Sequence, residues 1–255
     1  MSADSTRVAV ITGAAQGIGR ETARELDSRG WSLALLDQQQ IDVSTYRDAL
    51  CVMGDISDEF TVEGGAAQVI ARFGHVDALV NNAGISMIQA ALDTPSETYR
   101  KVLNVNLVAP FLLCKAYGRG MVERGSGAVV NVASVAGLQG VAERSAYNAS
   151  KHGLIGLTRT LAVEWGGRGV RVNAVCPGWV KTEMDHKDQA GGSYSDSDIT
   201  EHVPMGRFAR PQDIAQAIAW LCDPALSGFV NGIALPVDGG WTSDGSWQSL
   251  RLRQR

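Results

Sequence analysis

Tyr147 and Lys151 lie four positions apart in the stretch SAYNASKHGL, residues 145–154. Residues with this spacing share one face of a helix, so the phenol and the ammonium can approach the same point. Oxidising an alcohol requires removal of its hydroxyl proton, and a phenol with a pKa of about 10 is too weak a base at neutral pH. An adjacent ammonium stabilises the phenolate and lowers that pKa. The spacing therefore predicts an acid–base pair, unless both residues are ordinary members of a helix face.

Two further polar residues could complete such a site. Ser134 ends the apolar run GAVVNVAS, where its hydroxyl could hold a substrate oxygen against Tyr147 or simply cap a strand. Asn106 lies in a long helical pattern, and Pro110 follows four residues later. Because proline has no N–H to donate, we expect the Asn106 carbonyl to be free.

A second group of candidate residues follows the first apolar run. The stretch TGAAQGIG, residues 12–19, has the glycines that let a backbone approach a pyrophosphate at the start of a helix. Asp37 ends the second apolar run, where a carboxylate can accept hydrogen bonds from ribose hydroxyls. The Asp37 carboxylate would repel the 2′-phosphate of NADP with an interaction energy of up to about 4 kcal/mol. Since Gln16 and Gln38 are not the basic residues that a phosphate needs, the sequence favours NAD over NADP.

The elements that must position these residues alternate along the chain. Seven short apolar runs are typical of buried parallel strands: 7–13, 31–37, 49–55, 76–84, 127–134, 170–178 and 232–240. Helical patterns lie between them, at 17–29, 61–73, 96–124, 145–165 and 211–222. The alternation predicts an α/β fold with a single-domain, Rossmann-like, doubly wound parallel sheet of about seven strands flanked by helices. Residues 1–255 are expected to form one dinucleotide-binding and catalytic domain.

Three segments depart from this alternation. Between Asp37 and Asp55 the chain has room for only a turn or two of helix. Residues 185–203 are polar and aperiodic, and they follow the sixth predicted strand. Because ligands of such sheets bind beyond the carboxyl ends of the strands, this segment is either a substrate lid or a solvated loop. The tail at 243–255 is either a frayed terminus or, through Trp247 and its arginines, a contact with a neighbouring subunit.

Composition argues against several classes of partner and site. The formal net charge of −4 disfavours binding to nucleic acid or to an anionic membrane, since both need a basic surface. The four cysteines are scattered among apolar residues, without a Cys-x-x-Cys pair or clustered histidines, so we expect no disulfide framework and no metal site. The sequence shows no signal-peptide pattern and no run of about 18 apolar residues. The simplest expected location is the cytoplasm.

Together the motifs resemble the short-chain dehydrogenase/reductase family, from about Arg7 to Thr242. The matching pieces are TGAAQGIG, GDIS, NNAG, NVNL, the serine of VASVAG, YNASK, PGWVKT and VDGGW, in the family's order and spacing. The resemblance implies a catalytic group of Asn106, Ser134, Tyr147 and Lys151. It implies adenine contacts at Asp55 and Ile56, a nucleotide contact at Asn82, and carboxamide contacts from the Val180 backbone and Thr182. The full set expected to hold the cofactor NAD is Gly13, Gln16, Gly17, Ile18, Gly19, Asp37, Asp55, Ile56, Asn82, Tyr147, Lys151, Val180 and Thr182.

The function that this resemblance implies is NAD-dependent interconversion of a secondary alcohol and a ketone. It also suggests that the Asn106 carbonyl holds a water that links Lys151 to solvent in a proton relay. Related proteins are commonly tetramers, and the apolar parts of 100–117 and 146–163 could form such a contact between identical chains.

The substrate is expected to be a small polar molecule. The polar side chains of the lid segment favour a sugar or polyol, and hence a role in carbohydrate metabolism. Two other functions stay open. A 3-oxoacyl-type ketoreductase would generally prefer NADPH and a basic docking face, and Asp37 and the negative net charge count against it. A catalytically silent NAD-sensing regulator would be expected to have lost part of the catalytic group, whereas all four residues are present.

Overall fold

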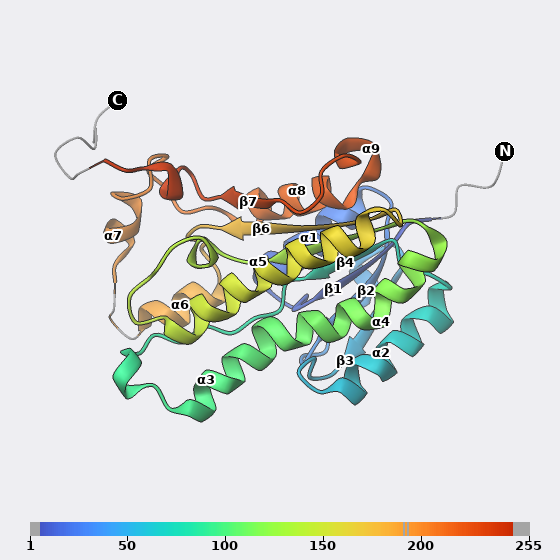
Figure 1. Cartoon of the computed structure of the whole chain (residues 1–255), viewed down its shortest axis with the longest axis horizontal. Coiled ribbons are helices and arrows are strands. Elements are labelled where there is room, and N and C mark those ends of the chain that lie inside the picture. Colours follow the sequence, from blue (N-terminus) through green and yellow to red (C-terminus); the bar gives the residue numbers. More distant parts are fainter. Residues whose placement is uncertain (1–5, 191, 193, 247–255) are drawn as a thin grey trace.

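A seven-stranded parallel sheet forms the centre of the computed structural model, which describes residues 6–190, 192 and 194–246 (Figure 1). The strands are β1 (Val8–Thr12), β2 (Ser32–Asp37), β3 (Ala49–Met53), β4 (Ala78–Asn81), β5 (Gly127–Val132), β6 (Val170–Pro177) and β7 (Ala234–Val237). Their order is β3-β2-β1-β4-β5-β6-β7. The crossovers therefore reverse direction between β1 and β4, which is the point where sheets of this kind bind ligands. The predicted doubly wound sheet is confirmed.

Helices cover both faces of the sheet (Figure 1). The longer ones are α1 (Gly17–Ser28), α2 (Glu59–Phe73), α3 (Ser96–Leu103), α4 (Ala109–Arg124), α5 (Ser145–Gly166) and α8 (Pro211–Cys222). Shorter ones are α6 (Glu183–Ala190), α7 (Asp196–Thr200) and α9 (Pro224–Ser227). Helices α2, α4 and α5 pack on one face, whereas α1 and α8 pack against each other on the opposite face. None of the described helices is both long and apolar enough to cross a membrane.

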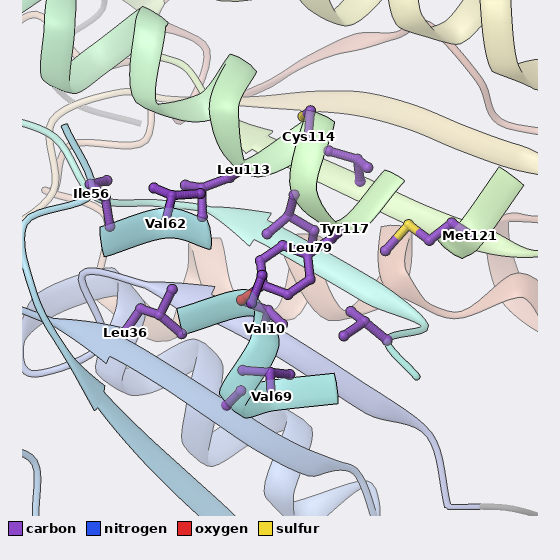
Figure 2. Close-up of a cluster of buried hydrophobic side chains, with 14 of the residues drawn as sticks. Val10, Leu36, Ile56, Val62, Val69, Leu79, Leu113, Cys114, Tyr117 and Met121 are labelled. Carbon is purple, nitrogen blue, oxygen red and sulfur yellow. The ribbon is translucent and has the colours of Figure 1, made fainter. Parts of the chain in front are cut away.

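The core divides into two main layers because alternate residues of a strand point to opposite faces. In β1, Val8 and Val10 join the layer under α2, α4 and α5, while Ala9 and Ile11 join the layer under α1 and α8. Figure 2 shows the first layer, where Val10 lies among side chains from several strands and helices. Burial on both faces explains why these strands are continuous apolar runs.

The predicted helix at 96–124 is interrupted. Residues Asn104–Val108 form a π-helical turn between α3 and α4, and the N–H of Ala109 donates to the carbonyl of Asn104, five residues earlier. Pro110 stands at the start of α4. Its lack of an N–H removes the ordinary bond to Asn106, and a wider turn accommodates the missing donor. The helical pattern at 96–124 is therefore found, and the irregularity expected at Asn106 takes the form of this π-helical turn.

The two irregular segments take short helical structure. Between β2 and β3 the chain forms only the 3-10 turn Val43–Thr45, as its shortness predicted. The candidate lid contains α6 and α7, so it is less irregular than its aperiodic sequence suggested. Both helices lie beyond the carboxyl end of β6 (Figure 1). Residues 247–255, which include Trp247 and the arginines of the tail, lie outside the described residues.

Candidate active site

The glycine turn after β1 brings the start of α1 close to the ends of β1 and β4. A Cβ on Gly19 would lie 2.1 Å from the Gly13 carbonyl oxygen, so only glycine permits this approach. Gly13 has a φ of +64°, in the left-handed region that favours glycine. The side-chain amide of Asn82 donates to the carbonyls of Thr12 and Gly13, at 2.9 and 3.1 Å. The turn is therefore tied to the carboxyl end of β4, at the switch point of the sheet.

Asp37 is held by backbone donors at the carboxyl end of β2. Its Oδ2 accepts from the N–H of Ala15 at 3.0 Å, and its Oδ1 accepts from the N–H of Gln39 at 3.0 Å. A cavity of about 360 Å³ adjoins this turn and is lined in part by Arg20 and Arg24. Sequence reasoning missed both arginines, because they lie on α1 and not beside Asp37.

The remaining predicted cofactor residues fall at the same end of the sheet. Asp55 accepts from the N–H and hydroxyl of Ser57, which holds the pKa of this carboxyl below its usual range. Ile56 is buried in the core layer under α2. Gln16 precedes α1 as its N-cap residue, and Ile18 packs on the opposite core layer.

Thr182 connects the segment after β6 with the segment after β1. A Cβ on Gly17 would lie 3.4 Å from the Thr182 methyl group, so Thr182 stands against the glycine turn. Val180 is buried and forms an isolated bridge with Ala209. The structure thus brings the ends of β1 and β6 together across the switch point.

Ser134, Tyr147 and Lys151 converge beyond β5. The Lys151 ammonium lies 5.6 Å from the centroid of the Tyr147 ring, and both side chains come from α5. The Ser134 side chain lies close enough to the Tyr147 hydroxyl to lower the pKa of that group. Lys151 Nζ donates to the carbonyl of Val132, the last residue of β5, at 2.7 Å. Lys151 is thus buried at the end of the sheet and Tyr147 is half-buried beside it, so neither side chain lies on a fully solvated helix face.

Asn106 is fully buried behind this group. Its side-chain Oδ1 accepts from the N–H of Ile85 at 2.9 Å, and its Nδ2 donates to the Ile85 carbonyl at 2.9 Å and to Ser150 Oγ at 3.1 Å. A Cβ on Gly84 would meet Asn106 Oδ1 at 3.2 Å and Lys151 Nζ at 3.6 Å. The glycine of the NNAG motif therefore leaves room for Asn106 and Lys151 to approach the same point.

Burial dominates the ionisation of the pair. It lowers the pKa of Lys151 to about 8, because the charged ammonium loses hydration. Burial also raises the pKa of Tyr147, while the Ser134 hydrogen bond and the charge of Arg144 lower it. In the protein alone the pKa of Tyr147 is thus raised, and the lowered pKa that the sequence predicted stays a prediction for the enzyme with its cofactor. The reason for the rise is that the Tyr147 hydroxyl is desolvated, an effect that no sequence spacing reveals.

Sequence reasoning also missed a polar cluster beside Tyr147. Arg144 Nη1 donates to Ser86 Oγ at 2.6 Å, and its Nη2 donates to Asp188 Oδ2 at 3.0 Å. Ser86 follows β4, and Asp188 lies on α6 in the candidate lid. The available signal was the position of Arg144 three residues before the tyrosine.

No group of three metal-ligating side chains occurs among the described residues. The site combines a glycine turn at a helix N-terminus, a carboxylate at the end of β2 and a Tyr–Lys–Ser group. The cradle closed by Gly13 and Gly19 fits a dinucleotide pyrophosphate. These features define a dinucleotide-binding protein of the Rossmann-like class, with the Tyr–Lys–Ser group at the same end of the sheet as the glycine turn.

Comparisons with known proteins agree with this class. A family model described as enoyl-(acyl carrier protein) reductase matches residues 13–242. The D-threitol dehydrogenase of Mycolicibacterium smegmatis is 38% identical over 247 residues, covering 92% of this chain and 93% of the relative. The cis-4-hydroxycyclohexanecarboxylate dehydrogenase of Sinomonas cyclohexanicum is 41% identical over 247 residues, covering 93% and 97%.

A solved structure of a variant of actinorhodin polyketide ketoreductase with NADPH superimposes with a TM-score of 0.89 at 34% identity, covering 96% of this chain and 100% of that chain. The chain belongs to the short-chain dehydrogenase/reductase family. It is an oxidoreductase that interconverts a secondary alcohol and a ketone on a small polar substrate, with a nicotinamide cofactor.

Proposed function

We propose that this oxidoreductase prefers NAD, acts on a sugar or polyol, and uses Tyr147 as its acid–base residue. The observation that carries the proposal is the convergence of three side chains: the half-buried Tyr147, the Ser134 side chain that lowers its pKa, and the buried Lys151 ammonium 5.6 Å from its ring centroid. Each group has a separate chemical task at the carboxyl end of β5.

The tasks follow from the contacts. Ser134 holds the substrate hydroxyl against Tyr147, and the Tyr147 phenolate takes the hydroxyl proton. Lys151 stabilises the phenolate by its positive charge. Asn106 fixes the backbone beside Lys151 through its bonds to Ile85, and its own carbonyl holds the water of the proton relay. The glycine turn at Gly13 and Gly19 would hold a nicotinamide cofactor, which would supply the hydride acceptor for the carbinol carbon.

The preference for NAD rests on Asp37. A 2′-phosphate near this carboxylate would meet a like charge, which costs up to about 4 kcal/mol at close approach. Arg20 and Arg24 line the adjoining cavity, but both pair with Glu21, at 3.5 and 2.8 Å. Their charges are thus partly offset by a carboxylate of the same helix. The ketoreductase solved with NADPH has the same fold, so the proposed preference for NAD depends on Asp37 and not on the fold.

The sugar or polyol preference rests on polar side chains above Tyr147 and on the relative named for D-threitol. Ser86, Arg144 and Asp188 line this region, and residues 185–203 would act as the lid. The expected homo-tetramer is supported by exposed apolar side chains, namely Phe111 on α4 and Val163 on α5, which are 48% and 83% exposed. We expect the assembled enzyme to work in the cytoplasm, as one domain over residues 1–255.

Absorbance at 340 nm with purified protein tests the proposal. NAD and NADP are compared across sugars, polyols, hydroxy acids and cyclic alcohols, with Tyr147→Phe as the control. Turnover with NAD that disappears in the variant is the expected result. Tight NAD binding without turnover would favour a sensor, and faster turnover with NADPH on 3-oxoacyl thioesters would favour the ketoreductase. Better oxidation of steroids than of any polyol would contradict the substrate class.

A further inference from the structure

Arg144 is a buried cation beside the acid–base residue. Its exposed fraction is 8%, and its guanidinium carbon lies 6.0 Å from the centroid of the Tyr147 ring and 5.5 Å from that of Trp179. An arginine keeps its charge at any ordinary pH, so burying it is costly unless anionic or polar acceptors surround it. The groups around the Arg144 guanidinium must therefore offset the cost of burying its charge.

The backbone around Arg144 is held in a fixed and strained form. Glu143, directly before it, has a φ of +60° and is the one described residue other than glycine with a positive φ. The Glu143 carbonyl accepts from the N–H of Gln89 at 2.7 Å, and Gln89 bridges to Arg144. Such strain persists only where surrounding contacts impose it, and it is commonly found at binding sites. Here it directs Arg144 toward the segment after β4.

The anionic partner of Arg144 comes from the lid. Asp188 Oδ2 accepts from Arg144 Nη2 at 3.0 Å and from Ser86 Oγ at 3.2 Å. Asp188 lies on α6, an element that follows β6, whereas Ser86 and Arg144 come from the body of the site. The lid thus supplies a carboxylate, that of Asp188, which accepts hydrogen bonds from the Arg144 guanidinium and the Ser86 hydroxyl beside Tyr147.

We propose that Arg144 is the specificity-determining residue of this enzyme and that it binds a carboxylate of the substrate in exchange for the Asp188 carboxylate. The planar guanidinium suits a carboxylate, which can accept two parallel hydrogen bonds from it. Ser86 Oγ supplies a further donor to the same group. The preferred substrates are then hydroxy acids, with the carboxylate on Arg144 and the carbinol between Ser134 and Tyr147. This inference rests on the proposed function and narrows its substrate class.

Two pairs of compounds isolate the carboxylate: D-gluconate against D-glucitol, and 3-hydroxybutyrate against butane-1,3-diol. We expect the wild type to favour the acid of at least one pair. In Arg144→Gln the KM for that acid should rise between about 10-fold and 100-fold, as for the loss of a charge-assisted bond. The KM for the matched neutral alcohol should rise much less, because that alcohol has no carboxylate to bind the guanidinium. Arg168→Gln, an exposed arginine after α5, is the control for loss of one positive charge.

The Asp188→Asn variant distinguishes a role of Arg144 in binding the substrate from a role in holding the lid closed. If a substrate carboxylate replaces Asp188, removing this competing charge should lower the KM for the acid several-fold. If the ion pair only closes the lid, both variants should raise the KM for acids and neutral alcohols alike, and the proposal is overturned. A wild-type enzyme that favours neither acid would overturn it as well.

The dependence of kcat/KM on pH provides a second test, because a purely structural role of Arg144 would not change it. The charge of Arg144 lowers the pKa of Tyr147, and that of Asp188 raises it. The pH at which kcat/KM for a neutral alcohol reaches half its maximum should therefore rise in Arg144→Gln and fall in Asp188→Asn.

Calorimetric titration with D-gluconate and with 3-hydroxybutyrate tests the contact without turnover. Weaker binding to Arg144→Gln than to the wild type supports the proposal, and equal or undetectable binding to both contradicts it. If binding is lost in this way but no alcohol is oxidised, the proposed function fails while the assignment of Arg144 stands.

Discussion

Replacing Lys151 by methionine should make the protein inactive and, at neutral pH, more stable. The side chain is 4% exposed, and its ammonium has one hydrogen bond, to the Val132 carbonyl at 2.7 Å. Methionine has a similar length and no charge, so it removes the cost of burying an ammonium while largely keeping the packing. The enzyme would carry this cost because an ammonium is needed beside Tyr147.

The magnitude follows from the pKa of Lys151. Burial lowers this pKa from 10.5 to about 8, which at about 1.4 kcal/mol for each pH unit corresponds to about 3 kcal/mol. Losing the bond to Val132 costs about 1–2 kcal/mol. The free energy of unfolding of Lys151→Met at pH 7 should therefore exceed that of the wild type by about 1–2 kcal/mol.

The sign of the pH dependence is fixed by the same shift. Because the pKa in the folded state is below that in the unfolded chain, the unfolded chain binds more protons between about pH 8 and pH 10.5. The free energy of unfolding of the wild type should rise across this window by about 3 kcal/mol relative to the variant. Below about pH 8 the full cost of the buried charge is present, and the difference is constant.

Urea unfolding at several pH values and one protein concentration measures this difference. A fixed concentration is needed because assembly would make the apparent stability depend on it. Groups that titrate in both proteins, such as the other tyrosines, cancel in the comparison. A variant less stable than the wild type at pH 7, or a difference independent of pH between 7 and 10, would refute the reasoning.

Three other changes test the site. Gly19→Ala should abolish cofactor binding and lower the free energy of unfolding by about 1–3 kcal/mol, because its Cβ would meet the Gly13 carbonyl at 2.1 Å. The control Gly64→Ala lies on α2 with open space around it, so thermal unfolding should show a free energy of unfolding about 0.5–1 kcal/mol higher than that of the wild type. Asp37→Ser should lower the KM for NADP relative to that for NAD by at least about tenfold in steady-state kinetics, and an unchanged ratio would show that Asp37 does not select the cofactor. Pro110→Ala should convert the π-helical turn at Asn104–Val108 into regular α-helix and reduce kcat. A crystal structure that shows the regular helix, together with an undiminished kcat, would exclude the proton relay through the Asn106 carbonyl.

The sheet and the acid–base pair were predictable because their signals are local. Strands buried on both faces must be apolar throughout, so β1 and β6 stand out as continuous runs. A spacing of four on a helix fixes the relation of Tyr147 to Lys151 before any packing is known. The glycines of the first turn are similarly required by backbone contacts at Gly13 and Gly19.

Features that depend on contacts between distant segments were not predictable in this way. The π turn before Pro110 is one of several ways to accommodate a missing N–H, and the sequence does not choose among them. The raised pKa of Tyr147 depends on desolvation by the surrounding elements. Helices α6 and α7 lack a strong apolar face, and the pattern that identifies longer helices is therefore missing.

Arg144 shows why substrate specificity was the least predictable property. In the sequence it is one arginine among polar residues at the start of a helix, a position that is usually solvated. Only the fold places Ser86 from the segment after β4 and Asp188 from α6 within 3.0 Å of its guanidinium. The proposed acid–base group draws on residues that are close together in sequence or lie at the end of a strand, whereas the Arg144 cluster is assembled from segments that meet only in space. The identity of the substrate therefore has to be inferred from this cluster and not from the motifs.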